Sequence, residues 1–304
     1  MLKKTAVLSF LIIIPFISVH AQDDANLLKS LSSISANSIM NFDKELSSTK
    51  FAGRFTGTKG YDLAAEWIIN LFKKWGIKPA GDKKTYLQKF PNPYTIVLDA
   101  GGLVLNNPDG SSSPRDYKYE EEYYPGATSD KGEITAEVVY VGYGITAPEL
   151  NYDDYKGIDV KGKLVFMNPE IPVNTDNPEL FKKWRPYSFH YYKIKNAAAH
   201  GAAGVIYNYH IVNPNCAFVK GLLKVNISKT VSDDIFKGTG KKLDDLLKQI
   251  RKDLQPASFN TKKIMTVKCN TKHYPDGMGS NVIGVINGND PVYNSANSLR
   301  IFCK

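Results

Sequence analysis

The sequence predicts a mixed α/β to α+β fold in which one domain is inserted into another. Three observations predict it. Apolar residues at helical spacing open the chain, short strands and helices alternate over about 91–258, and two strands close it. This order indicates a host domain that is split around an inserted module.

The first part of the chain is expected to be helical. Residues 23–48 carry apolar side chains at roughly helical spacing, and a glycine-rich loop follows at 51–60. Thr58 is placed to cap the next helix, which is expected to end at Gly76. The apolar face of that helix comprises Ala64, Trp67, Ile68, Leu71, Phe72 and Trp75.

The amino-acid composition changes after Phe90, since residues 91–125 are rich in turn-forming residues. The elements expected after it are strands at 134–145, 162–167, 204–209 and 222–227, helices at 187–200 and 241–254, and closing strands at 264–269 and 281–286.

The first 21 residues are expected to be a signal peptide. Lys3 and Lys4 precede a nearly continuous apolar run over 6–19, and small residues allow cleavage after Ala21. No later apolar run approaches membrane length, so no membrane span is expected after its removal. The protein is therefore expected to be exported, either periplasmic or secreted.

Composition excludes several classes of function. The formal net charge of +9 is spread along the chain without a recognition motif, so no nucleic-acid partner is expected. Cys216, Cys269 and Cys303 are too few for a disulfide scaffold, and at least one thiol must stay unpaired.

The common nucleophile and phosphate motifs are absent. No G-x-S-x-G pattern occurs, and 111–113 is expected to be a loop. A helix follows Gly53, Gly57 and Gly60, but these glycines do not have the spacing of a phosphate loop. Gly238 and Gly240 do not have that spacing either. Turn and cap geometry is the preferred interpretation of these glycines.

No metal site or other catalytic site follows from the residues alone. The acidic stretches 120–122 and 153–154 are expected at the surface, and Cys216 has no histidine base nearby in sequence. No metal-ligand motif contains the four histidines after the leader, which are interpreted as structural or exposed: His190, His200, His210 and His273. Catalytic, cofactor-binding and metal-binding residues are therefore all predicted to be none.

Several segments, in order, resemble exported zinc-dependent aminopeptidases of metallopeptidase family twenty-eight. The Gly-Arg and Gly-Thr loop within 46–62 and the sequence Gly-Ile-Lys-Pro-Ala-Gly-Asp at 76–82 resemble the opening of these enzymes. The segments that resemble their inserted protease-associated domain are 139–149, 154–166 and 195–206. Residues 279–291 resemble the return to the peptidase domain.

The resemblance implies a domain plan. It comprises a signal peptide (1–21), a helical part of a peptidase-like domain (22–90), an inserted mixed α+β protease-associated domain (91–258), and the first peptidase strands with a truncated tail (259–304). The implied fold is an incomplete zinc-peptidase domain that is split by the insertion.

The resemblance also implies hydrolysis at peptide N termini by two zinc ions, which polarise the scissile carbonyl and activate water. In the family, a His-x-Asp motif follows Asn-Val-Ile-Gly, but neither a histidine nor an acidic residue follows Asp290 here. No zinc ligand is therefore carried over, and no cofactor is expected in this chain, which is expected to be truncated and inactive alone. A frameshift or premature stop is preferred over a genuinely short relative.

The alternative is a stand-alone, non-catalytic protease-associated module that binds peptide or protein. The sequence leaves open whether the chain is itself an enzyme, and it leaves open the oligomeric state, the cysteine pairing and the substrate preference.

Overall fold

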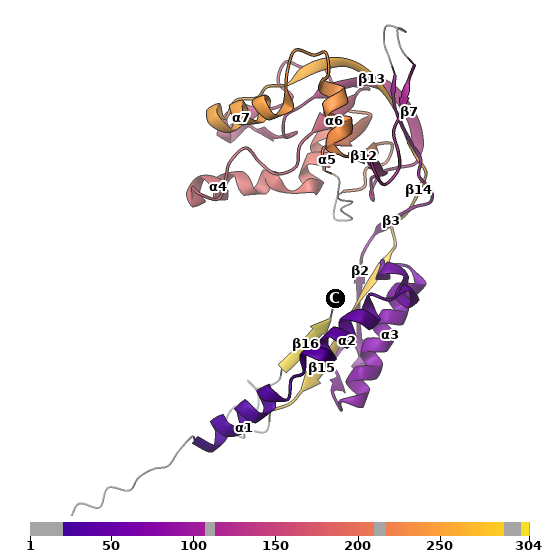
Figure 1. Cartoon of the computed structure of the whole chain (residues 1–304), viewed down its shortest axis with the longest axis vertical. Coiled ribbons are helices and arrows are strands. Elements are labelled where there is room, and N and C mark those ends of the chain that lie inside the picture. Colours follow the sequence, from indigo (N-terminus) through magenta and orange to yellow (C-terminus); the bar gives the residue numbers. More distant parts are fainter. Residues whose placement is uncertain (1–20, 107–112, 210–216, 289–298, 304) are drawn as a thin grey trace, which may run out of the picture. The chain divides into compact units, whose positions relative to one another are not determined.

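The computed structural model describes residues 21–106, 113–209, 217–288 and 299–303 (Figure 1). The chain forms two compact units. Among the described residues, unit 1 comprises 21–86, 282–288 and 299–303, and unit 2 comprises 87–106, 113–209 and 217–281. The chain therefore builds most of unit 1, then unit 2, and then returns to unit 1.

Unit 1 combines helices with a small sheet. Its helices are α1 (Ala21–Ser32), α2 (Ala36–Leu46), the short η1 (Thr49–Arg54) and α3 (Lys59–Lys74), and a further turn, η2, spans Asp82–Lys84. Strand β15 (Met278–Ile286), which enters unit 1 at Val282, pairs antiparallel with β1 (Lys78–Pro79) and β16 (Leu299–Cys303). Strand β2 (Leu87–Pro91), which also pairs with β15, belongs to unit 2.

The α3 helix lies where the sequence predicted it. It begins after Thr58 and is followed by Gly76, whose φ of +69° suits a glycine that ends a helix. Gly60 packs directly on the backbone of buried Phe51, since a Cβ at position 60 would lie 1.7 Å from the Phe51 carbonyl oxygen. Gly60 therefore serves close packing within α3, whereas Gly53 and Gly57, with φ of +78° and +82°, have the turn geometry that the sequence predicted.

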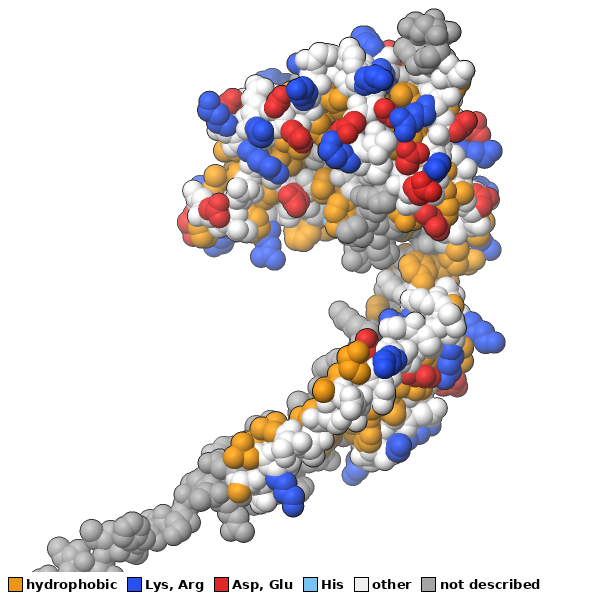
Figure 2. All heavy atoms as spheres, in the orientation of Figure 1, with side chains coloured by type: hydrophobic (Ala, Val, Ile, Leu, Met, Phe, Trp, Pro, Cys, Tyr) orange, Lys and Arg blue, Asp and Glu red, His pale blue; other side chains and the backbone are white. Residues whose placement is uncertain are grey.

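The predicted helical lead-in is two helices, α1 and α2, whose apolar side chains are exposed in unit 1. Figure 2 shows apolar atoms at the surface along this part of the chain. The exposed residues include Leu27, Leu28, Leu31, Ile34, Ile39 and Met40.

Unit 2 is built on an eight-stranded mixed sheet in the order β5-β4-β13-β7-β10-β11-β12-β6. Strands β7 (Gly132–Tyr140), β10 (Leu164–Met167), β11 (Gly204–Tyr207) and β12 (Leu223–Ile227) are parallel. Their neighbours β4 (Gly102–Asn106), β5 (Arg115–Asp116), β6 (Tyr123–Pro125) and β13 (Phe259–Cys269) pair antiparallel. All four residues of β10 are buried, as expected for a parallel strand covered on both faces.

Strand β13 lies inside unit 2, between β4 and β7, whereas the sequence plan placed 259–304 after the inserted domain. Met265 and Val267 are buried in the core cluster of unit 2. An apolar strand shows no preference for one of two sheets until its pairing partners are known. Two-stranded sheets of β3 (Tyr94–Val97) with β14 (Thr271–Tyr274), and of β8 (Thr146–Ala147) with β9 (Tyr152–Asp153), complete unit 2.

Helices cover both faces of the unit 2 sheet. One face packs on α5 (His190–Ala199) through Ile194 and Ala197. The other packs on α6 (Lys229–Phe236) and α7 (Leu243–Asp253). A third cluster holds α4 (Pro178–Trp184), and two short helices, η3 (Pro148–Leu150) and η4 (Arg185–Ser188), complete the described elements. The sequence did not predict α6, which is short and mixes charged and apolar residues.

Candidate functional site

The carboxyl ends of the parallel strands meet at one edge of the unit 2 sheet, the region where open α/β sheets bind ligands. The side-chain amide of Asn208, after β11, donates to Asn168 Oδ1 at 2.8 Å. The amide of Asn168, after β10, donates to the Gly142 carbonyl at 2.9 Å. On β12, the Asn226 amide donates to the Tyr209 carbonyl at 2.7 Å. These bonds tie the strand ends together and hold the edge in one arrangement.

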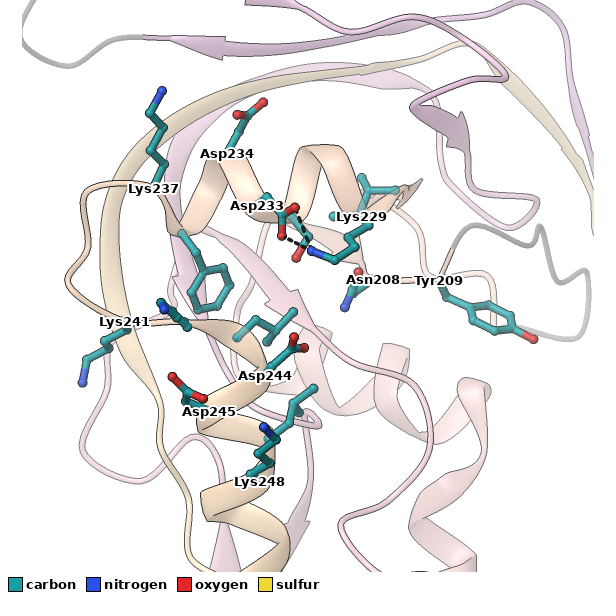
Figure 3. A pocket seen from close by; sticks show the side chains of 16 residues that line it. Asn208, Tyr209, Lys229, Asp233, Asp234, Lys237, Lys241, Asp244, Asp245 and Lys248 are labelled. Atoms are coloured by element: carbon teal, nitrogen blue, oxygen red, sulfur yellow. Dashed lines mark hydrogen bonds and ion pairs between the residues drawn. The ribbon is translucent and has the colours of Figure 1, made fainter.

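A cavity of about 890 Å³ opens at this edge between α6 and α7 (Figure 3), and we call it the α6–α7 cavity. Five lysines and four aspartates line it together with seven uncharged residues, so it combines an apolar wall, polar groups and a charged rim. Its uncharged lining is Asn208, Tyr209, Ile227, Ser232, Phe236, Leu243 and Leu247. In the view of Figure 2, basic and acidic side chains are interspersed over this face of unit 2.

Part of the charged rim is already paired. Lys229 Nζ contacts both carboxylate oxygens of Asp233, at 2.6 and 2.8 Å. The hydrogen bond to Asp233 is the main cause of a raised pKa of Lys229, and the charge of Asp244 adds to it. Asp244 and Asp245 form no ion pair among the described residues.

Asp234 lines the cavity but is already paired with residues that do not line it. It pairs with Arg115, and the Tyr117 hydroxyl donates to it at 3.1 Å. Burial, and then the charge of Asp234, raise the pKa of Tyr117, so the phenol stays protonated. Asp234 therefore stabilises the packing of α6 and is not available to a ligand.

Ser232 differs from the other polar lining residues. Its side chain is 1% exposed, and Oγ has no hydrogen-bond partner in the described part of the chain. Buried hydroxyls without partners are rare in folded proteins.

A second cavity of about 610 Å³ lies between the loop after β10 and the start of α5. Glu170, Asp176 and His190 line it, and Tyr209 lines both cavities. Because Tyr209 lines both cavities, the two cavities are adjacent along the strand ends. Glu170 has a φ of +64°, an uncommon value for a residue with a side chain.

His190 lies beside two buried lysines. Its Nδ1 is 2.5 Å from the Tyr207 hydroxyl. Burial, and then the charges of Lys224 and Lys193, lower the pKa of His190. The Lys224 side chain is 1% exposed, and its Nζ has no hydrogen-bond partner within the described ranges. Burial and the two lysine charges therefore favour the neutral imidazole.

The lowered pKa of His190 makes unit 2 less stable in acid. The unfolded chain takes up a proton near the ordinary pKa of about 6.5, whereas the folded chain resists it. The contribution is therefore present above that pH and is lost as the pH falls toward the folded pKa. His190→Gln should reduce the loss of stability between pH 7.5 and 5.5, measured by urea unfolding with Trp184 fluorescence. An NMR titration of the His190 ring with its midpoint at or above 6.5 would contradict the assignment.

Asp154 corrects a sequence interpretation. It was expected at the surface, but it is completely buried. Its carboxylate accepts hydrogen bonds from the backbone of Tyr143 (3.1 Å) and Ile145 (3.0 Å) and from the Tyr152 hydroxyl (2.8 Å). Lys193 Nζ, also buried, donates to the Tyr143 carbonyl at 2.5 Å. Burial raises the pKa of Asp154 and lowers the pKa of Lys193. This group shapes the loop between β7 and β8.

The other predicted histidines do not converge. The His200 ring stacks on the Tyr155 ring, with 4.1 Å between the ring centroids. His273 Nδ1 is 2.9 Å from Thr95 Oγ1. His190 and His200 therefore contact different residues although both lie on or beside α5. His210 lies outside the described residues.

Cys269 is buried. In the acidic stretch 120–122, Glu122 forms an ion pair with Arg115 at 2.8 Å. Cys216 lies outside the described residues, as do the side chain of Cys303, most of 111–113, and the leader up to residue 20.

Among residues 21–106, 113–209, 217–288 and 299–303, no three His, Cys, Asp or Glu side chains form a group able to hold a metal ion. These residues therefore do not fit the zinc pair that the family resemblance implies. In the same ranges, no helix has the length and apolar content needed to cross a membrane.

No protein-family model matches the chain, and no curated protein matches it. Solved structures do. They include an aminopeptidase from Aneurinibacillus sp. strain AM-1 (TM-score 0.46, 19% identity, covering 78% of this chain and 45% of that chain). BSAP, a zinc aminopeptidase from Bacillus subtilis, matches with a TM-score of 0.45 and 19% identity, covering 81% and 46%. A peptidase M28 precursor from Shewanella amazonensis SB2B matches with a TM-score of 0.44 and 14% identity, covering 81% and 52%.

The chain thus spans about half the length of these structures. At these scores the likeness assigns neither an activity nor a substrate to this chain.

Proposed function

We propose that the chain is part of an exported zinc aminopeptidase-like protein, in which unit 2 is a protease-associated domain that binds the peptide substrate. The motifs at 46–62, 76–82 and 279–291 support the peptidase-like lineage, and those at 139–149, 154–166 and 195–206 support the inserted domain. Export is proposed from the leader sequence.

The observation that carries the binding role is the pair of cavities at the carboxyl edge of the unit 2 sheet. Both have the volume of a ligand site, and both include Tyr209. Asparagine amides, a serine hydroxyl and apolar side chains suit a peptide, which offers alternating amide groups and side chains. The lining does not suit a metal ion, because the acidic groups are spread around the rim.

We further propose that the chain alone binds peptides without hydrolysing them. Hydrolysis by the family's chemistry needs metal ligands that the described residues do not bring together. In this proposal unit 2 holds substrate, and bond cleavage needs other residues.

The test uses the purified full chain, a panel of fluorescent peptides and added zinc. We expect saturable peptide binding by fluorescence anisotropy and no release of N-terminal residues by mass spectrometry. Tyr209→Ala should weaken binding by about tenfold if the shared wall contributes as a central aromatic contact does. Tyr191→Ala is the matched control, because Tyr191 is exposed, stacks on Phe189 and lines neither cavity.

Two results would count against the proposal. Zinc-dependent release of N-terminal residues would overturn the inactivity of the isolated chain. Absence of binding across the panel would overturn the binding role.

A further inference from the structure

We infer that the surface formed by α4, η4 and α5, which we call the α4–α5 surface, binds the anionic headgroups of a lipid bilayer. The inference goes beyond peptide binding by unit 2 and does not depend on it. Unpaired basic side chains, exposed aromatic rings beside them and the shape of the surface carry it. The residues of the surface are Lys182, Lys183, Arg185, Phe189, Tyr191 and Lys195.

The basic side chains come from one continuous stretch of the chain. Lys182 and Lys183 lie in the last turn of α4, Arg185 begins η4, and Lys195 lies in α5. All four are exposed, and none of them forms an ion pair among the described residues. The surface therefore presents four positive charges that no side chain of the described chain neutralises by direct contact.

Few negative charges oppose these cations. The sequence contains neither Asp nor Glu over 180–232. Glu179 lies in the first turn of α4, where the positive end of the helix dipole attracts its charge. Glu149 accepts a hydrogen bond from Tyr187 of η4. On the rim of the α6–α7 cavity, by contrast, lysines and aspartates occur together and some of them are paired. The α4–α5 surface is therefore complementary in charge to a polyanion.

Phe189 and Tyr191 add apolar area within the same stretch. They are 41% and 48% exposed, and their rings stack with 5.4 Å between the ring centroids. Tyr191 and Lys195 lie four residues apart, so they share one face of α5. Aromatic rings beside lysine and arginine are typical of the boundary between lipid headgroups and acyl chains, where the rings enter and the charges meet phosphates. The composition of the surface thus fits a bilayer.

The shape of the surface also favours a bilayer over a peptide. None of its six residues lines the α6–α7 cavity or the second cavity. Peptides are usually bound in a groove or at a sheet edge, whereas a bilayer is itself an extended surface. Figure 1 shows α4 at one edge of unit 2, and Figure 2 shows basic and apolar atoms next to one another at that edge.

Vesicle co-sedimentation tests the inference, with the chain cleaved at its expected site after Ala21. The vesicles are phosphatidylcholine alone, or phosphatidylcholine with about one third phosphatidylglycerol. We expect at least about tenfold tighter binding to the anionic vesicles, lost as the ionic strength rises from about 0.05 to about 0.5 M. The exposed apolar residues of α1 and α2 contribute to both kinds of vesicle, so the difference reports on charge. Equal binding to both kinds overturns the inference.

Charge variants locate the surface. The triple variant Lys182→Gln, Lys183→Gln, Arg185→Gln should weaken binding to anionic vesicles by about a hundredfold, at about fivefold for each basic residue. The matched control removes the same charge from three exposed lysines between α6 and α7 and should weaken binding less than about threefold: Lys237→Gln, Lys241→Gln and Lys242→Gln. Because all six side chains are exposed, neither variant should lower the melting temperature. Equal effects of the two triple variants overturn the assignment to the α4–α5 surface.

An aromatic variant and two soluble probes separate a bilayer from other anions. Phe189→Ala with Tyr191→Ala should weaken binding to anionic vesicles by about tenfold, through lost apolar contact, and leave its salt dependence unchanged. Polyglutamate offers an acidic peptide, and glycerol phosphate offers a free phosphate. An unchanged affinity of the aromatic variant overturns the bilayer assignment. So does polyglutamate binding as tight as vesicle binding, or displacement from vesicles by glycerol phosphate at the same phosphate concentration.

Discussion

Replacing Asp154 by alanine is expected to destabilise unit 2 by about 3–5 kcal/mol, the cost of breaking a buried charged group. The substitution leaves two backbone N–H groups and the Tyr152 hydroxyl without their acceptor, in a completely buried position. Lys193 loses the nearby negative charge at the same time. Unfolding in urea can be followed by the fluorescence of Trp184, which is 1% exposed. Its ring packs on the ring of Tyr152, with 5.1 Å between the ring centroids.

Asp154→Asn separates hydrogen bonding from charge. The backbone N–H groups of Tyr143 and Ile145 both donate to Oδ2, and the Tyr152 hydroxyl donates to Oδ1. An asparagine with its oxygen at the Oδ2 position keeps both backbone bonds and can donate its amide to Tyr152. We therefore expect a smaller loss of about 1–2 kcal/mol. An equal loss for asparagine and alanine would mean that the charge near Lys193, and not the hydrogen bonding, stabilises the loop.

Replacing Gly60 by alanine is expected to destabilise unit 1 by about 3 kcal/mol, at the upper end of overpacking effects. At an unrestricted site in a helix, this change would stabilise by about 1 kcal/mol. Here the new Cβ would lie 1.7 Å from the Phe51 carbonyl oxygen, and backbone atoms cannot move aside as a flexible side chain does. Helix α3 must therefore shift away from η1.

Gly76→Ala is the control for this prediction. Gly76 has a φ of +69° but no atom within 4 Å of the new Cβ, so only backbone strain of about 1 kcal/mol is expected. Trp67 and Trp75 report on unit 1 in a Trp184→Phe background. Equal losses at positions 60 and 76 would contradict the contact between α3 and Phe51.

Local sequence patterns predicted the helices and strands whose buried apolar residues occur at regular spacing. Helix α3 follows from the spacing of Ala64 and Phe72, both buried, and β10 follows from its unbroken apolar run. The short helix α6 was missed because Lys229, Asp233 and Asp234 interrupt its apolar residues, and its buried face exists only against the sheet.

The candidate site depends on information that no local pattern contains. Asp154 lies in a polar, tyrosine-rich stretch, and its burial depends on donors from Tyr143 and Ile145, which lie on the preceding loop. Ser232 and Asp244 belong to different helices and line one cavity only through the packing of those helices on the strand ends. Single-sequence periodicity identifies a helix face but not the element opposite it.

The position of β13 determines the order in which unit 2 can fold during synthesis. The strand pairs with β4 and β7, which precede it by much of the unit, and β14 likewise returns to β3. While the ribosome is still making α6 and α7, β4 and β7 have no partner on the sides that β13 later occupies, and such open edges favour aggregation. Because pairing across this much chain closes slowly, the nascent protein depends on the last strand of unit 2 to protect the first ones.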